Sequence, residues 1–277
     1  MRPGYIQGIG DRARSDILRY SMSIKPKLDS WLLDPEPSSM HPAYEDKAAG
    51  VVIVEGSSTE VDLRKFASPV EDQRWLNSCV GNAVVGGLEL LRLASGHDHV
   101  DLSRLFVYYN ARNEHSAQTL DKGTYIRSAM LTLQKLGVCK EETWAYNMNK
   151  VFVRPSWNSY REAYLNKIDD YYRIRSYGSS RLDAIETALR ARHPVAFGMK
   201  VDDKFVENRD GHPKFTSSSK WEGRHAMLIV GFNKTSKTLI VRNSWGTSWG
   251  DDGYCYLPYD ALQAAESDDF WVMTGLS

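Results

Sequence analysis

A single cysteine, Cys79, stands between a polar loop and a run of small apolar residues in the stretch EDQRWLNSCVGNAVVGG, residues 71–87. A cysteine that serves only for packing normally has apolar neighbours on both sides. The pattern instead places Cys79 at the first turn of a helix, where the positive end of the helix dipole favours the thiolate. We therefore expect Cys79 to be a nucleophile, against the simpler alternative of an inert buried cysteine.

A thiolate nucleophile needs a basic partner, and that partner needs a group that orients it. Among the seven histidines, only His225 opens a hydrophobic strand pattern after a glycine-containing loop, in EGRHAMLIVGF. Asn243 ends the next strand pattern, and a hairpin through NKTSK would bring it beside His225. Gln73 lies in the loop before Cys79, so its side-chain amide and the Cys79 backbone N–H are the expected oxyanion donors. These four residues predict acyl-transfer chemistry.

The elements that must position these residues fall into two halves. Apolar residues at helical spacing predict helices near residues 15–23 and over about 79–94, 101–114 with Asp101 as N-cap, 124–137 from Thr124 to Gly137, and 179–194 before Pro194. Short segments rich in β-branched and aromatic residues predict strands at 171–177, 194–201, 225–233, 238–245 and 254–259. Helices followed by antiparallel strands indicate an α+β fold.

Composition narrows the class of protein. The chain has 277 residues, 42% of them hydrophobic, and its 35 basic and 35 acidic residues cancel. That length suffices for one large domain or two smaller ones. Zero net charge and the lack of basic runs argue against nucleic acid as a partner. No stretch of about 18 apolar residues predicts a membrane span. The N-terminus lacks the apolar core of a signal peptide, so a cytoplasmic location is the default expectation.

Metal and cofactor chemistry find little support in the sequence. Cys79, Cys139 and Cys255 are too few and too scattered for a disulfide framework, and none belongs to a C-x-x-C pair. GHDHVD, residues 96–101, holds metal-binding residue types, but a solvated loop that ends in a helix cap accounts for it. We expect no metal and no cofactor.

Together these motifs resemble those of the papain-like cysteine peptidases, and most closely those of its bacterial members. PVEDQRWLNSC is similar to that family's glutamine-to-cysteine block, with the spacing of six residues intact, and NSWGTSWGDDGY matches its asparagine block almost residue for residue. VDLRKFASPV resembles the start of the mature domain, and DKGTYIRSAML resembles its substrate-binding glycine segment. The similarity covers about residues 60–260.

The resemblance implies a two-lobed fold and a reaction. A helical lobe over residues 58–171 would pack against an antiparallel, β-barrel-like lobe over residues 172–277, with the active-site cleft between them. Residues 1–57 would form an N-terminal, propeptide-like extension. The implied activity is hydrolysis of peptide bonds in a peptide or protein substrate through a thioester acyl-enzyme.

The resemblance also assigns residues by matching position. Cys79 would be the nucleophile, His225 the general base, Asn243 the group that orients the imidazole, and Gln73 part of the oxyanion hole. The implied substrate-binding residues are Gly123, which pairs with an extended peptide, Ala226, which lines the main specificity pocket, and Trp245, which shields the asparagine–histidine contact. Three positions depart from the family's pattern: Leu76 replaces a disulfide cysteine, Val80 an aromatic residue, and Asn77 a glycine at the first substrate site.

Two other functions stay open at this point. A papain-fold amidase or transglutaminase-like acyl transferase would use the same residues, and a non-catalytic protein would hold a peptide in the cleft without turnover. The N-terminal extension also has two interpretations. We expect it to lie over the Cys79 cleft as an intramolecular inhibitor, and the alternative is a packing arm or a disordered tail.

Overall fold

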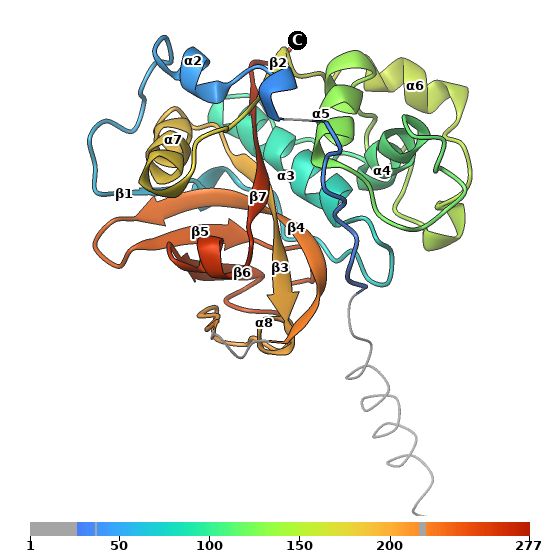
Figure 1. Cartoon of the computed structure of the whole chain (residues 1–277). Coiled ribbons are helices and arrows are strands. Elements are labelled where there is room, and N and C mark those ends of the chain that lie inside the picture. Colours follow the sequence, from blue (N-terminus) through green and yellow to red (C-terminus); the bar gives the residue numbers. More distant parts are fainter. Residues whose placement is uncertain (1–26, 37, 216–219) are drawn as a thin grey trace, which may run out of the picture.

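The computed structural model describes residues 27–36, 38–215 and 220–277. The helices of this part of the chain are α2 (Tyr44–Ala48), α3 (Cys79–Ala94), α4 (Arg104–Asn113), α5 (Ile126–Lys135), α6 (Trp157–Ala163), α7 (Gly178–Arg190), α8 (Asp203–Val206) and α9 (Ala261–Ala264), with 3-10 turns η1 (Ser38–Met40), η2 (Arg64–Phe66) and η3 (Met148–Lys150). Helices α4, α5 and α6 gather on one side of the molecule (Figure 1). The helix predicted near residues 15–23 lies outside the described residues.

One antiparallel sheet occupies the other side of the molecule (Figure 1). Its strands are β1 (Glu60–Asp62), β2 (Asp170–Arg173), β3 (Val195–Asp202), β4 (Trp221–Asn233), β5 (Thr238–Arg242), β6 (Tyr254–Pro258) and β7 (Asp268–Thr274). Their order is β2-β7-β3-β4-β5-β6, and β1 pairs with β4. The predicted NKTSK turn joins β4 to β5. Helices α4, α5 and α6 lie on one side, and the antiparallel sheet lies on the other with α2 and α7 beside it (Figure 1). This arrangement confirms the α+β class.

Helix α3 lies at the centre of the fold and carries Cys79 at its first position. Its residues from Cys79 to Leu91 are all buried, as expected for a helix that is apolar almost all round. Gly87 allows β7 to come close, since a Cβ there would lie 2.7 Å from Met273 Cε. The paired glycines therefore weaken the helix locally but permit its close packing on the sheet.

The helix caps differ from the sequence prediction in two places. Helix α4 has Ser103 rather than Asp101 as its N-cap, because the Ser103 hydroxyl accepts the Phe106 N–H at 3.1 Å. Helix α5 begins after Tyr125, not at Thr124. Thr124 is held in extended conformation by a pairing with the N-terminal segment, which the local sequence pattern does not reveal.

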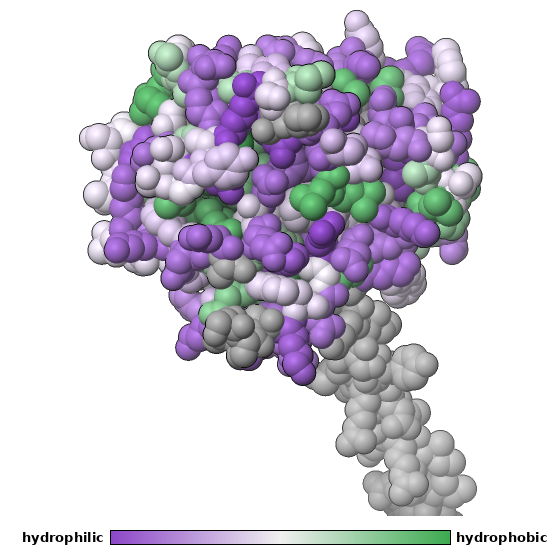
Figure 2. Space-filling model, viewed as in Figure 1, coloured by the Kyte–Doolittle hydropathy of each residue, from purple (hydrophilic) through white to green (hydrophobic). Residues whose placement is uncertain are grey.

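Segments from the N-terminal half of the chain pack with the sheet of the C-terminal half. Strand β1, which precedes α3 in sequence, pairs with β4 in the sheet. Strand β7, which the sequence prediction missed, lies between β3 and the edge strand β2. Residues from the N-terminal extension also enter the core, since Trp31 and Tyr44 are buried. The face drawn in Figure 2 is mostly hydrophilic, with apolar residues in small separate groups. Within the described ranges, the helices are too short or too polar to cross a bilayer.

Candidate active site

The Cys79 thiol is completely buried at the start of α3. Its Sγ lies 3.0 Å from the Ser30 hydroxyl and 3.3 Å from the Ala226 backbone nitrogen, which donates to it. Ala226 directly follows His225 in β4, so α3 and the sheet meet at the sulfur. The structure thus brings the predicted nucleophile to the strand that carries the predicted base, and Ser30, which the sequence prediction missed, closes the site.

The His225 ring is oriented by Asn243 and Trp245. His225 Nε2 lies 2.7 Å from Asn243 Oδ1. That oxygen also accepts the Ser244 N–H at 2.8 Å, and an amide oxygen cannot donate, so Nε2 carries the ring hydrogen. The Trp245 indole stacks on the imidazole with ring centroids 4.4 Å apart. His225 Nδ1 is buried without a hydrogen-bond partner among the described residues, which leaves it available to exchange a proton.

Gln73 is held in place by Ser244. The Ser244 hydroxyl donates to Gln73 Oε1 at 2.7 Å, and the Gln73 backbone N–H donates to the Ser244 carbonyl at 2.8 Å. Gln73 Nε2 donates one hydrogen to the Leu76 carbonyl at 3.0 Å, so its second amide hydrogen remains for another acceptor. Sequence reasoning did not name Ser244, although its place inside the NSWG block was a usable signal.

Asp121 ties the loop before Cys79 to the loop before α5. Its Oδ1 accepts the Asn77 N–H at 3.0 Å and the Tyr108 hydroxyl at 2.7 Å. The Asn77 side chain donates to the Asp121 carbonyl oxygen at 2.5 Å. The amide of Asn77 is therefore turned toward Asp121. Leu76 stands beside this contact where the family resemblance implied a disulfide cysteine, so a polar network links the two loops instead. Asp121 was not predicted.

Residues 28–33 of the N-terminal extension, here called the covering segment, lie against the site. Ser30 N–H donates to the Arg224 carbonyl at 3.2 Å, and Leu32 N–H donates to the Thr124 carbonyl at 3.1 Å. Thr124 N–H donates to the Ser30 carbonyl at 3.3 Å, which makes a parallel bridge. The covering segment thus pairs with Thr124, the residue that follows Gly123. Gly123 is needed for the approach, because a Cβ there would lie 2.2 Å from the Ser30 carbonyl oxygen.

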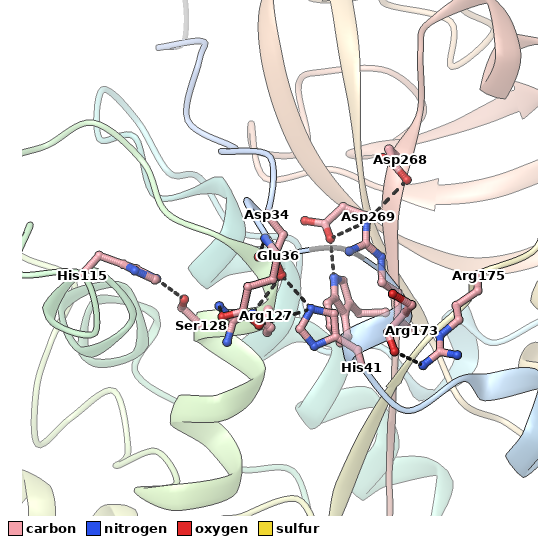
Figure 3. A network of polar contacts seen from close by, with 12 residues as sticks. Asp34, Glu36, His41, His115, Arg127, Ser128, Arg173, Arg175, Asp268 and Asp269 are labelled. Carbon is pink, nitrogen blue, oxygen red and sulfur yellow. Dashed lines mark hydrogen bonds and ion pairs between the residues drawn. The ribbon is translucent and has the colours of Figure 1, made fainter.

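An ionic network anchors the chain just beyond the covering segment (Figure 3). Arg127 of α5 contacts Asp34 Oδ2 at 2.8 Å and Glu36 Oε1 at 3.0 Å. His41 Nε2 lies 3.3 Å from the same Asp34 oxygen, and the Asp34 side chain is fully buried. Because buried ion pairs are costly to break, the contacts of Asp34 with Arg127 and His41 hold the chain at this point.

The charge state of the site differs from the sequence prediction of a thiolate. Burial raises the pKa of Cys79 to about 11, even though the Ser30 hydrogen bond opposes the shift. Burial likewise lowers the pKa of His225 to about 4, against the effect of the Asn243 hydrogen bond. A helix dipole stabilises an anion by only about 0.3–1 kcal/mol, whereas a buried ion costs several kcal/mol. Under the covering segment the pair is therefore thiol and neutral imidazole.

Comparisons with known proteins agree with this geometry. A family model described as papain family cysteine protease matches residues 57–268. An uncharacterised peptidase C1-like protein of Acanthamoeba polyphaga mimivirus is 34% identical over 227 residues, covering 76% of this chain and 73% of that protein. Falcipain-3 of Plasmodium falciparum is 26% identical over 219 residues, covering 72% of this chain and 40% of that protein. The crystal structure of xylellain, a cysteine protease from Xylella fastidiosa, is 28% identical, with a TM-score of 0.77 and coverage of 91% of this chain and 98% of that one.

Proposed function

Because this chain belongs to the papain family of cysteine proteases, we propose that it hydrolyses peptide bonds at Cys79 through a thioester acyl-enzyme. The observation that carries this assignment is the contact of 2.7 Å between His225 Nε2 and Asn243 Oδ1. It engages one ring nitrogen and leaves Nδ1 for the thiol, which stands beside the backbone of the next residue. An oriented base with one free ring nitrogen, adjacent in sequence to the residue that contacts the sulfur, supports a nucleophile–base pair.

The reaction proceeds once the covering segment has left. His225 Nδ1 takes the proton from Cys79 Sγ, and the sulfur attacks the peptide carbonyl carbon. The Cys79 N–H and the free amide hydrogen of Gln73 donate to the resulting oxyanion. The C–N bond then breaks as His225 gives its proton to the leaving amine, which leaves a thioester. Water attacks the thioester after losing a proton to His225, and the C–S bond breaks to release the acid.

The covering segment holds the enzyme in a latent form. It places the Ser30 hydroxyl on the sulfur and pairs its backbone with Thr124, so a peptide strand cannot occupy the same place. In this closed form, burial raises the pKa of Cys79 and lowers that of His225, which favours the uncharged state of both groups. The intramolecular partner is therefore the chain's own N-terminal extension, and peptide or protein substrates compete with it.

Product analysis in heavy-oxygen water tests hydrolysis against acyl transfer. If the chain is a peptidase, each newly formed carboxyl group acquires one oxygen from water, because water resolves the thioester. Mass spectrometry of the cleaved peptides measures this directly. Unlabelled, amine-coupled products would instead indicate the transferase. Alkylation of Cys79 without any turnover of peptides would indicate the non-catalytic peptide-binding protein.

The thiol of the latent chain is expected to remain protonated from about pH 5 to 9. The Cys79 thiol loses its proton only as the pH approaches its pKa of about 11. The His225 ring gains a proton only as the pH falls toward its pKa of about 4. Both groups therefore stay uncharged between these two values. The ultraviolet absorbance of a thiolate, taken as the difference between the full chain and Cys79→Ala, should be absent over this range. A difference signal already present at neutral pH would contradict the buried, uncharged pair.

A further inference from the structure

The outward face of α6 is apolar and aromatic, the reverse of what a surface helix normally presents. Trp157 at its first position is 71% exposed, and Tyr164 and Leu165, which directly follow its last residue, are 68% and 73% exposed. Trp157 and Tyr164 are about two helical turns apart and therefore lie on the same side. Ser159 and Ala163 on the opposite side are completely buried. The inward side of α6 is thus packed, while its apolar side faces water.

The loop that leads into α6 extends this face. Phe152 and Val153 are 52% and 49% exposed. The next residue, Arg154, has its Cζ 5.7 Å from the centre of the Tyr160 ring in α6, so the loop lies against the helix. Single exposed apolar side chains are normal, but a group of this size on one part of a protein marks an interaction surface. The group, here called the α6 surface, consists of Phe152, Val153, Trp157, Tyr164 and Leu165.

Cations lie over the rings of the α6 surface. Arg161 Cζ is 4.7 Å from the centre of the Trp157 ring, and Lys167 Nζ is 3.8 Å from the centre of the Tyr164 ring. Within the described ranges, other residues make the ion pairs of the protein, so Arg154, Arg161 and Lys167 have no carboxylate partner there. Their charges remain available to an anionic partner.

Positive charge is concentrated at this place in a chain whose basic and acidic residues are equal in number. Residues 150–167 contain four basic residues and one acidic residue, Glu162. Glu162 Oε2 accepts the backbone N–H of Lys140 at 3.2 Å, which directs this carboxylate toward the loop after α5. The partner of the α6 surface is therefore expected to be anionic as well as apolar.

A bilayer with anionic lipids meets both conditions. Tryptophan and tyrosine rings favour the head-group level, where lysine and arginine meet the lipid phosphates and carboxylates. A bilayer also accepts a convex helix without a matching pocket, whereas a protein partner must supply a surface of complementary shape. Helix α6 lies at the outer edge of the molecule, where a flat surface can reach it (Figure 1).

We infer that the α6 surface attaches the protein to the surface of membranes that contain anionic lipids. Trp157 and Tyr164 enter the head-group level, and Arg154, Arg161 and Lys167 pair with lipid phosphates and carboxylates. Attachment of this kind is peripheral and needs no helix that spans the bilayer. The inference concerns where the enzyme acts, so it is independent of the proposed peptidase function.

Sedimentation of the full chain with lipid vesicles tests the inference. Vesicles of two parts phosphatidylcholine and one part phosphatidylserine should bind at least about tenfold more tightly than phosphatidylcholine alone, because each cation contributes about fivefold near an anionic surface. Raising the salt from about 0.1 M to about 1 M shortens the screening length from about 10 Å to about 3 Å and should release the protein. No sedimentation with either vesicle would overturn the inference in favour of an acidic protein partner.

Two double variants show whether the α6 surface makes this contact. Trp157→Ala combined with Tyr164→Ala should weaken binding to the anionic vesicles at least about tenfold, because two rings no longer leave water. Arg161→Gln combined with Lys167→Gln should weaken it about 25-fold and make it less sensitive to salt. Wild-type binding by both double variants, with unchanged Tm, would show that the α6 surface is not the site of attachment.

Tyr177→Ala is the matched control. Tyr177 is 72% exposed and its ring also lies beside an arginine, with Arg181 Cζ 4.8 Å from the ring centre, but it belongs to the start of α7 and not to the α6 surface. Its replacement should leave vesicle binding unchanged. Equal losses in Tyr177→Ala and in the Trp157 and Tyr164 double variant would refute a specific role of α6.

Discussion

Replacing Cys79 by alanine is expected to abolish peptide hydrolysis, lowering kcat/KM by at least about 10⁴-fold. No other group can take the place of the sulfur, because the thioester forms on it and His225 acts only through proton transfer. The Cys79 side chain is buried at the first turn of α3, and alanine fits there without new contacts. Rates with a fluorogenic peptide measure the loss, and circular dichroism and Tm show whether the fold is kept.

Cys139→Ala and Cys255→Ala are matched controls for this experiment. Both cysteines are as completely buried as Cys79, but neither has a place in the proposed site. Each control should retain activity and should still be alkylated once, at Cys79, by iodoacetamide. Normal hydrolysis by Cys79→Ala, or loss of the alkylation site in a control, would refute the assignment of the nucleophile.

Replacing Trp31 by alanine is expected to accelerate alkylation of Cys79 and hydrolysis of peptides by about 100-fold or more. Truncating a buried tryptophan costs about 3–5 kcal/mol, and each 1.4 kcal/mol corresponds to about tenfold in an equilibrium. In this chain the loss destabilises mainly the closed form. Trp31 belongs to the covering segment, and its indole packs against Gly198 and Asp269 in the rest of the fold. Time courses of iodoacetamide labelling, mapped to Cys79, measure the change.

A second variant displaces the covering segment by changing the residue of β3 against which Trp31 packs. Gly198→Ala leaves the covering segment unchanged, but its Cβ would fall 2.1 Å from the Trp31 indole, so labelling of Cys79 should again accelerate. Trp157→Ala is the matched control, since that tryptophan is 71% exposed on α6. Unchanged labelling in both Trp31→Ala and Gly198→Ala, with the fold intact, would show that the covering segment does not restrain the enzyme.

The sequence by itself determined the reacting groups and most of the local structure. Cys79 at a helix start, His225 at a strand and Asn243 beyond the next turn are set by neighbours a few residues away. The spacing of hydrophobic residues that predicts helices and strands is a local property of the sequence. For this reason α3 coincides with its predicted range, and the predicted NKTSK turn joins β4 to β5. The asparagine block NSWGTSWGDDGY also carries the resemblance to the family that the family model confirms.

Only the tertiary structure decided how the site is closed and which charges it holds. Ser30 reaches Cys79 from 49 positions away, and Trp31 reaches Asp269 from 238 positions away. Contacts between residues so far apart in sequence do not affect the hydrophobic spacing of either segment. Sequence patterns therefore did not predict Ser30, Asp121 or Asp269. Burial, which depends on the whole fold, reversed the expected ionisation of Cys79, because desolvation outweighs the dipole of a single helix.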